Sequence, residues 1–266
     1  HCISSAASDV YKRQLKFRAS WGRVGNDRLK DENGNDIRFP YLTTLGNVSS
    51  TWGTGLAENR TGSMNLKWEV STKTNFGIDA RFFDDKVDMT VDFFHTKTTD
   101  IFQRRANIPD EGGLSNVLPY ANIGSMKSWG MDGTLAYTHT FNKDMALTVR
   151  GNFTHAENEV IYWEQSGVNY PYQSNSGVPY KVQRGLIALG LFKDEDDIKS
   201  SPKQTFMDNY RPGDIKYKDV NGDGKIDKDD VVPLNYSAVP FIQYGFALDW
   251  NYKAFRVSIL FEGVSK

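Results

Sequence analysis

The acidic segment DVNGDGKIDKDD, residues 219–230, has the residue types and spacing of a metal-binding loop. Oxygen-bearing side chains stand at positions 1, 3, 5, 9 and 12, and Gly224 occupies position 6, where such a loop turns sharply. Ile226 at position 8 is expected to anchor the loop in a core. The pattern predicts one Ca²⁺ site with six ligands: Asp219, Asn221, Asp223, the carbonyl of Lys225, Asp227 and Asp230. A solvated acidic turn is the alternative, because Asn-Gly and Asp-Gly pairs are common in turns.

A second acidic run and a group of aromatic residues lie in the same long segment. The run KDEDD, residues 193–197, favours a solvated face or the start of a helix over a second cation site. Trp163, Tyr170 and Tyr172 are candidate substrate-binding residues, because aromatic rings can stack on sugar rings. The alternative is that these rings pack the segment against itself or against a partner protein.

Signals for catalysis and for nucleic-acid binding are absent from the sequence. The four histidines show no metal-binding spacing, the only cysteine is Cys2, and there is no phosphate loop or nucleophile elbow. The 32 basic and 33 acidic residues give a net charge of −1, which does not indicate a nucleic-acid partner. We therefore expect no enzyme and no nucleic-acid-binding protein.

The segments that must position these residues show the two-residue period of β-strands. Apolar residues alternate with polar ones in residues 15–24, 74–83, 86–97, 129–138 and 145–154, and again in two segments between 242 and 261. Most of these segments are about ten residues long, which is the length that crosses a bilayer at a tilt. Short turns at 84–85, 142–144 and 251–254 alternate with long connections at 25–63, 100–120 and 157–240. We expect residues 25–63 to hold little regular structure.

These features predict an all-β protein, an antiparallel transmembrane β-barrel segment with long extracellular loops. The longest apolar run, residues 185–192, is too short for a transmembrane helix. Outer-membrane barrels combine short periplasmic turns, long outer loops, an apolar face toward lipid and a polar face toward the lumen. Closure into a barrel also satisfies every strand edge within the membrane.

The two ends of the chain are expected to be boundaries of a fragment. Residues 1–14 lack the features of a signal peptide and resemble a translated adapter, so we interpret them as a non-native leader. Residues 15–266 are then part of one barrel, with the Ca²⁺-binding-like loop at 219–230 inside an outer loop.

Several segments, in order along the chain, resemble the SusC/RagA-like TonB-dependent outer-membrane transporters of Bacteroidota. They are NLKWE (65–69), VDFFHTKTTDI (91–101), ANIGSM (121–126), GLF (190–192), PGDIKYKDVNGDGKID (212–227), PFIQYGF (240–246) and YKAF (252–255). The resemblance covers residues 15–266, and the segment at 212–227 is its most specific part.

The resemblance implies a 22-stranded barrel in the cell outer membrane that imports glycans or peptides with energy from the TonB complex. It also implies a SusD-like surface lipoprotein over the mouth of the barrel and contact with outer-membrane lipid. This chain would be part of the C-terminal half of that barrel. The alternative is a secreted carbohydrate-binding or dockerin-like Ca²⁺-dependent interaction module, although dockerins carry two such loops, each followed by a helix.

Overall fold

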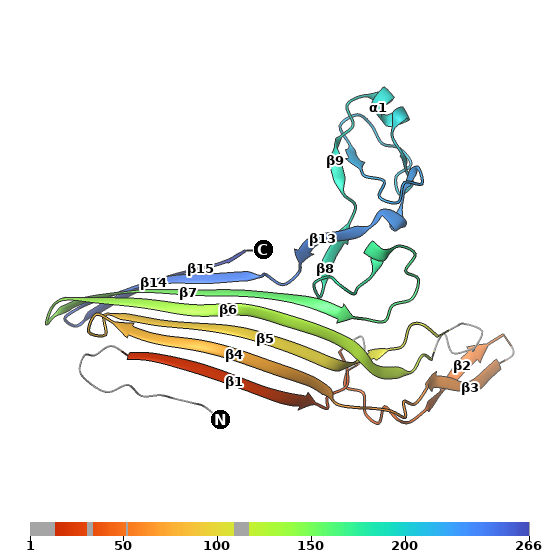
Figure 1. The fold of residues 1–266 in the computed structure, drawn as a ribbon. Helices are drawn as coiled ribbons and strands as arrows, with labels where there is room; N and C mark the ends of the chain where they lie inside the picture. Colours follow the sequence, from red (N-terminus) through yellow and green to blue (C-terminus); the bar gives the residue numbers. More distant parts are fainter. Residues whose placement is uncertain (1–13, 31–33, 52, 109–116, 266) are drawn as a thin grey trace.

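The computed structural model describes residues 14–30, 34–51, 53–108 and 117–265, and its main feature is one antiparallel sheet of seven strands (Figure 1). The strand order is β1-β4-β5-β6-β7-β14-β15, so each strand pairs with the next strand of the sheet along the chain. The strands are β1 (Gln14–Asn26), β4 (Glu69–Phe82), β5 (Val87–Arg104), β6 (Tyr120–Asn142), β7 (Met145–Tyr162), β14 (Ile242–Tyr252) and β15 (Phe255–Ser265). The predicted all-β, antiparallel fold class is confirmed.

The register of the ladder places apolar and polar side chains on opposite faces of the sheet. One row across the strands pairs Phe17, Ile78, Val91, Gly133, Phe153 and Tyr244 in turn. The next row pairs Lys16, Asp79, Thr90, Thr134, Asn152, Gly245 and Glu262. Because side chains alternate along a strand, the whole sheet has one apolar face and one polar face. Large apolar side chains on the apolar face are solvent-exposed here, among them Phe17 and Tyr244 at 53% and Phe261 at 61%.

Three tight turns lie together at one end of the sheet (Figure 1). In the β4–β5 turn, Phe83, Asp84 and Asp85 all have positive φ, a conformation that Asp tolerates better than a bulky residue. Lys253 in the β14–β15 turn donates its backbone N–H to the carbonyl of Asp144 in the β6–β7 turn, at 2.8 Å. The long connections leave from the opposite end, as the alternation of short and long connections predicted.

Two expectations about the extent of the strands are corrected. Residues 25–63 contain a hairpin of β2 (Thr44–Ser50) and β3 (Gly53–Arg60), which the Gly-, Asn- and Ser-rich composition concealed. Strands β5, β6 and β7 reach 18, 23 and 18 residues and extend well beyond the ten-residue segments of clear alternation. The extra residues are 98–104 of β5, where the register shifts around Ile101, 120–128 and 139–142 of β6, and 155–162 of β7.

The proposed leader lies almost entirely outside the described residues. Residues 1–13 are not described, whereas Gln14 is the first residue of β1 and pairs with Arg81. The strand therefore begins one residue before the expected boundary at 15.

The connection between β7 and β14 forms a separate lobe above the end of the sheet (Figure 1). Its elements are η2 (Pro171–Gln173), β8 (Val182–Gly185), β9 (Ala188–Leu191), α1 (Glu195–Ser200), β10 (Lys203–Gln204), β11 (Ile215–Tyr217), β12 (Lys225–Ile226), η3 (Lys228–Asp230) and β13 (Val232–Ser237). Phe192, Ile226 and Val232 are buried apolar side chains of this lobe. In the part of the chain that the structure describes, no helix has the length and apolar character needed to cross a membrane.

We predict that Gly130→Ala destabilises the sheet, because a Cβ at Gly130 would lie 2.1 Å from the backbone oxygen of His155 in β7. Overpacking against backbone typically costs about 1–3 kcal/mol. Thermal unfolding of the full-length receptor in detergent should show a lower midpoint than wild type. Gly151→Ala is the matched control, because the nearest atom to its Cβ is 3.9 Å away. Equal midpoints for the two variants would contradict the prediction.

Candidate functional site

Ion pairs cross the strands on the polar face of the sheet. Arg18 on β1 contacts Asp79 on β4 at 2.9 Å and Asp92 on β5 at 2.8 Å. Gly77 makes room for this bridge, since a Cβ there would lie 2.5 Å from Asp92 Oδ1 and 2.7 Å from Arg18 Cζ. The three strands are therefore held together by side chains as well as by the backbone ladder.

Asp249 is the centre of a second cross-strand cluster on the polar face. Its carboxylate is buried and accepts hydrogen bonds from Arg150 on β7 at 2.5 Å and from Ser258 on β15 at 2.6 Å. Arg256 lies 3.7 Å from the same carboxylate. A buried charge requires partners of this kind, so the polar face is an ordered wall of paired charges.

The apolar face ends in a band of aromatic and charged residues on the side of the long connections. Lys127, two residues from Trp129 on β6, lies with its ammonium 5.3 Å from the centroid of the Trp129 ring. Its Nζ also contacts Glu159 on β7 at 2.9 Å. An aromatic girdle followed by charged residues is typical of the border between lipid and water in a membrane barrel.

The predicted Ca²⁺ loop has the backbone turns that its sequence requires. Gly222 and Gly224 have φ of +77° and +82°, and both donate their N–H groups to the carboxylate of Asp219. Asp223 accepts a hydrogen bond from the N–H of Lys225 at 2.8 Å. Ile226 is 1% exposed, which confirms that it anchors the loop in the core of the lobe.

Asp230 closes the loop from its last position. Its side chain is fully buried and accepts hydrogen bonds from the backbone N–H groups of Val220 at 2.7 Å and Asp227 at 2.9 Å. In the described ranges, no group of three or more His, Cys, Asp or Glu side chains is placed to hold a metal ion. The backbone path thus fits a cation loop, while its carboxylates point to backbone N–H groups and do not converge on one point.

The three candidate substrate-binding aromatics fall into two different places. Tyr170 and Tyr172 stack on each other with ring centroids 5.4 Å apart, and both contact the acidic loop. The hydroxyl of Tyr172 donates to the carbonyl of Asp229 at 2.6 Å, and that of Tyr170 accepts from Asn221 Nδ2 at 3.3 Å. Burial raises the pKa of Tyr172. Trp163 lies apart from them and lines two cavities at the end of β7.

Several residues that position this lobe carried no recognisable signal in the sequence. Arg184 on β8 donates to the carbonyls of Tyr172 and Ser174, which fixes the path of the segment around η2. Glu164, buried just beyond β7, pairs with Arg105 at 2.8 Å and accepts from the backbone N–H of Asn107. Each contact joins residues that are ten or more positions apart, so no local pattern predicts it.

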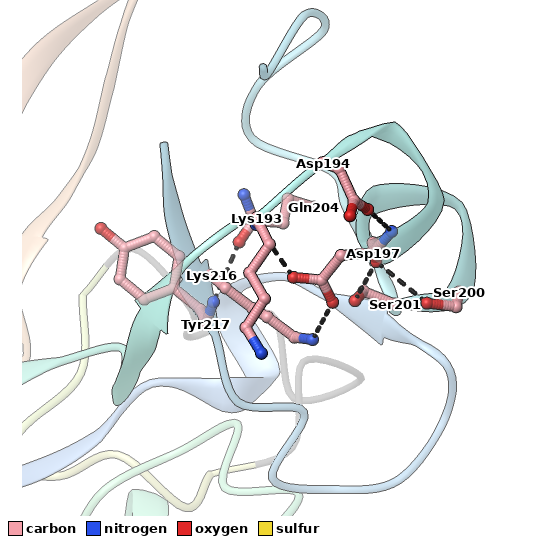
Figure 2. Close-up of polar contacts among 8 residues, drawn as sticks. All are labelled: Lys193, Asp194, Asp197, Ser200, Ser201, Gln204, Lys216 and Tyr217. Carbon is pink, nitrogen blue, oxygen red and sulfur yellow. Dashed lines mark hydrogen bonds and ion pairs between the residues drawn. The ribbon is translucent and has the colours of Figure 1, made fainter. Parts of the chain in front are cut away.

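The acidic run at 193–197 begins helix α1, as predicted. Figure 2 shows Asp194 accepting from the backbone N–H of Asp197, which is the bond of an N-terminal cap. The carboxylate of Asp197 accepts from Lys216 Nζ at 2.8 Å and from the backbone N–H of Lys193 at 3.1 Å. The hydrogen bond from Lys216 has the larger effect, and together the two bonds hold the pKa of Asp197 below its usual value.

The sheet defines a class of protein: one with strands of membrane-crossing length, an apolar outer face, a polar inner face and long loops at one end. The sequence model described as "TonB dependent receptor-like, beta-barrel" matches residues 4–259. The chain belongs to this family and is SusC/RagA-like, a barrel portion of an outer-membrane receptor. The family consists of receptors and not enzymes, which confirms the expectation that the chain has no enzymatic role.

Relatives of known identity support this assignment. TonB-dependent receptor P26 of Formosa agariphila is 28% identical over 266 residues, covering 94% of this chain and 25% of the relative. TonB-dependent receptor SusC of Bacteroides thetaiotaomicron is 25% identical over 231 residues, covering 81% of this chain and 21% of SusC. The chain therefore spans about a quarter of the length of the curated relatives it matches.

A solved structure has the same fold. The structure of the RagAB peptide importer in its open-open state aligns with a TM-score of 0.69 at 22% identity, covering 94% of this chain and 26% of that one. The seven-stranded sheet and the lobe above it thus correspond to part of a larger barrel fold.

We predict that Asp197→Asn removes an acid-sensitive restraint on the lobe. Because the pKa of Asp197 is lowered by folding, its stabilising effect is present above the unfolded pKa of about 3.9 and is lost as pH falls through the folded value. Amide hydrogen exchange of residues 190–217, corrected for intrinsic rates, should quicken at low pH in wild type. The same amides in the variant should exchange faster than those of wild type at pH 7, and acidification should raise their exchange rate little further. An unchanged pH profile would contradict this role.

Proposed function

We propose that this chain forms part of the barrel wall and outer loops of a TonB-dependent importer of glycans or peptides. The observation that carries the proposal is the two-faced sheet, whose apolar face suits lipid and whose polar face of paired charges suits a water-filled lumen. The family match and the similarity to SusC support it.

The partners proposed for the complete receptor follow from its relatives. We propose a SusD-like surface lipoprotein above the loops and the TonB complex as the source of energy, with the outer-membrane lipid around the apolar face. One structure of similar fold is titled a peptide importer, and this description belongs to that protein. For the present receptor it supports peptides as one candidate substrate class beside glycans.

A dockerin-like secreted module is not favoured by the structure of the lobe. The acidic loop ends in the short η3 and is followed by strand β13, whereas a dockerin loop continues into a helix. The loop also lies between two strands of one continuous sheet, β7 and β14.

We predict that deleting the receptor gene in the source bacterium abolishes growth on at least one oligosaccharide or oligopeptide that wild type imports. A strain that lacks TonB should show the same defect, because transport needs its energy. Uptake of radiolabelled substrate by whole cells is the measurement. Normal uptake of every tested glycan and peptide by the deletion strain would contradict the proposed function.

We also propose that the loop at 219–230 binds one Ca²⁺ ion that stiffens the lobe. The proposed ligands are Asp219, Asn221, Asp223, the carbonyl of Lys225, Asp227 and Asp230. The left-handed glycines and the buried Ile226 support it, and the oxygens bonded to backbone N–H groups retain acceptor capacity for an ion. An affinity on the order of 10⁻⁴–10⁻³ M suffices for a structural role outside the cell.

We predict that Asp223→Asn weakens Ca²⁺ binding to the full-length receptor by at least tenfold, because it removes one anionic ligand. Terbium luminescence and calorimetry should report one site in wild type. Asp229→Asn is the matched control, since Asp229 stands at position 11 of the loop and is not a proposed ligand. Equal affinities in the two variants, or no binding by wild type, would contradict the ligand set.

A further inference from the structure

The apolar face of the sheet carries basic side chains at one place. Arg23 on β1, Lys97 on β5 and Lys127 on β6 lie in a single row of the ladder, with Thr72 of β4 between the first two. Within the seven strands as described, and in β5 before the register shift near Ile101, alternation places no other Lys or Arg on this face. We call these three residues the basic row.

Two residues of the basic row have no ion pair in the described part of the chain. On the polar face, arginine side chains contact aspartates on neighbouring strands. In the basic row, Lys127 Nζ contacts Glu159 at 2.9 Å, whereas Arg23 and Lys97 are exposed and lack an acidic partner among the described residues. Nor does the apolar face hold an Asp or Glu on the described stretches of β1, β4 and β5 before the register shift. The charges of Arg23 and Lys97 are therefore available to a group outside this chain.

Two lysines of the basic row stand directly opposite each other. Lys97 on β5 pairs in register with Lys127 on β6. The Cβ atoms of directly opposite residues are about 4.5–5.5 Å apart, and like charges in this arrangement destabilise a sheet. Glu159 offsets the charge of Lys127 from β7, on the side away from Lys97. An anionic group that contacts both lysines would relieve the remaining repulsion.

The basic row lies just beyond a row of rings. Trp21, His95 and Trp129 form the next row of the apolar face, toward the tight turns. From Trp129, the apolar-face residues of β6 continue without Lys, Arg, Asp or Glu to Phe141, twelve residues away. At about 3.3 Å per residue and a tilt of about 40°, this stretch is about 30 Å high, which accommodates an apolar band about 25 Å tall. The basic row therefore lies at the level of the lipid headgroups.

The position of the basic row fits the outer leaflet of the membrane. The row is at the end of the sheet from which the long connections leave, and such connections lie outside the cell in outer-membrane barrels. Adjacent strands are about 4.8 Å apart, so Arg23 and Lys127, three strands apart, are separated by about 14 Å. Their long side chains can reach one headgroup across this distance. Exposed apolar side chains of the same face, such as Phe93 at 44%, are available to acyl chains.

We propose that the basic row binds the phosphate of an anionic lipid in the outer leaflet of the outer membrane. Arg23 and Lys97 supply charge-assisted hydrogen bonds to the phosphate oxygens, and Lys127 contributes from the opposite strand. The acyl chains of the same lipid lie against the apolar side chains between the basic row and the tight turns. The inference rests on the proposed function, in which this face contacts lipid, and adds the headgroup chemistry and the residues that recognise it.

Native mass spectrometry of the full-length receptor in detergent tests this inference. The probes are lipid A, the same lipid after removal of its phosphates, and inorganic phosphate. Lipid A should bind at least tenfold more tightly than its dephosphorylated form, and its affinity should fall with added salt. Inorganic phosphate, which has no acyl chains, should bind at least tenfold more weakly than lipid A. Equal binding of the two lipids, or binding of inorganic phosphate as tight as that of lipid A, would overturn the inference.

The variant Lys97→Gln separates recognition from structure. It should bind lipid A about fivefold more weakly, the effect of one basic residue near a charged lipid surface. In lipid-free detergent it should unfold at the same or a higher temperature, because it removes the repulsion from Lys127. Lys73→Gln is the matched control, since Lys73 is exposed on the polar face and pairs with Thr96, beside Lys97. Equal affinities in the two variants, or a lower unfolding temperature of Lys97→Gln, would overturn the role of Lys97.

The proposed function has a separate readout. A receptor that supports uptake in cells but binds lipid A and its dephosphorylated form equally would contradict the inference alone. A deletion strain with no uptake defect would contradict the proposed function.

Discussion

The continuous antiparallel ladder from β1 to β15 is the constraint on which the rest of the structure depends. In lipid, each backbone N–H and C=O must find a partner within the protein, and strands achieve this only by pairing with neighbours. The ladder fixes the register, and the register sends every second side chain to the same face. The apolar outer surface, the charged inner wall and the position of the loops all follow from that one pattern.

Charge pairs on the inner face show how a polar wall remains ordered. Arg18 reaches across β4 to Asp92 because Gly77 leaves space for its guanidinium, and buried Asp249 is held by Arg150 and Ser258. Small residues on this face therefore have a steric role that complements the charges. Because of such pairs, a wall can present charge to water while its buried charges have partners.

The lobe between β7 and β14 is organised differently, by short-range turns around a few buried side chains. Ile226 anchors the acidic loop, while Tyr170 and Tyr172 join that loop to η2. The cavity that Trp163 lines together with Gln103 lies near the base of this lobe, where the strands end and the loops begin. Residues from two strands, β5 and β6, and from the connections that follow β1, β5 and β7 thus meet at one place, although they are distant in the sequence.

The sequence alone determined the strand pairs, the turns, the two faces and the backbone path of the acidic loop, because these depend on periods of two residues and on local turn chemistry. It did not predict the β2–β3 hairpin, where alternation is weak, or the full lengths of β5–β7. Only the tertiary structure showed that Tyr170 and Tyr172 contact the acidic loop while Trp163 lines a cavity with Gln103. Those contacts join residues about 50–60 positions apart, and their geometry is set by the register of the sheet and the packing of the lobe.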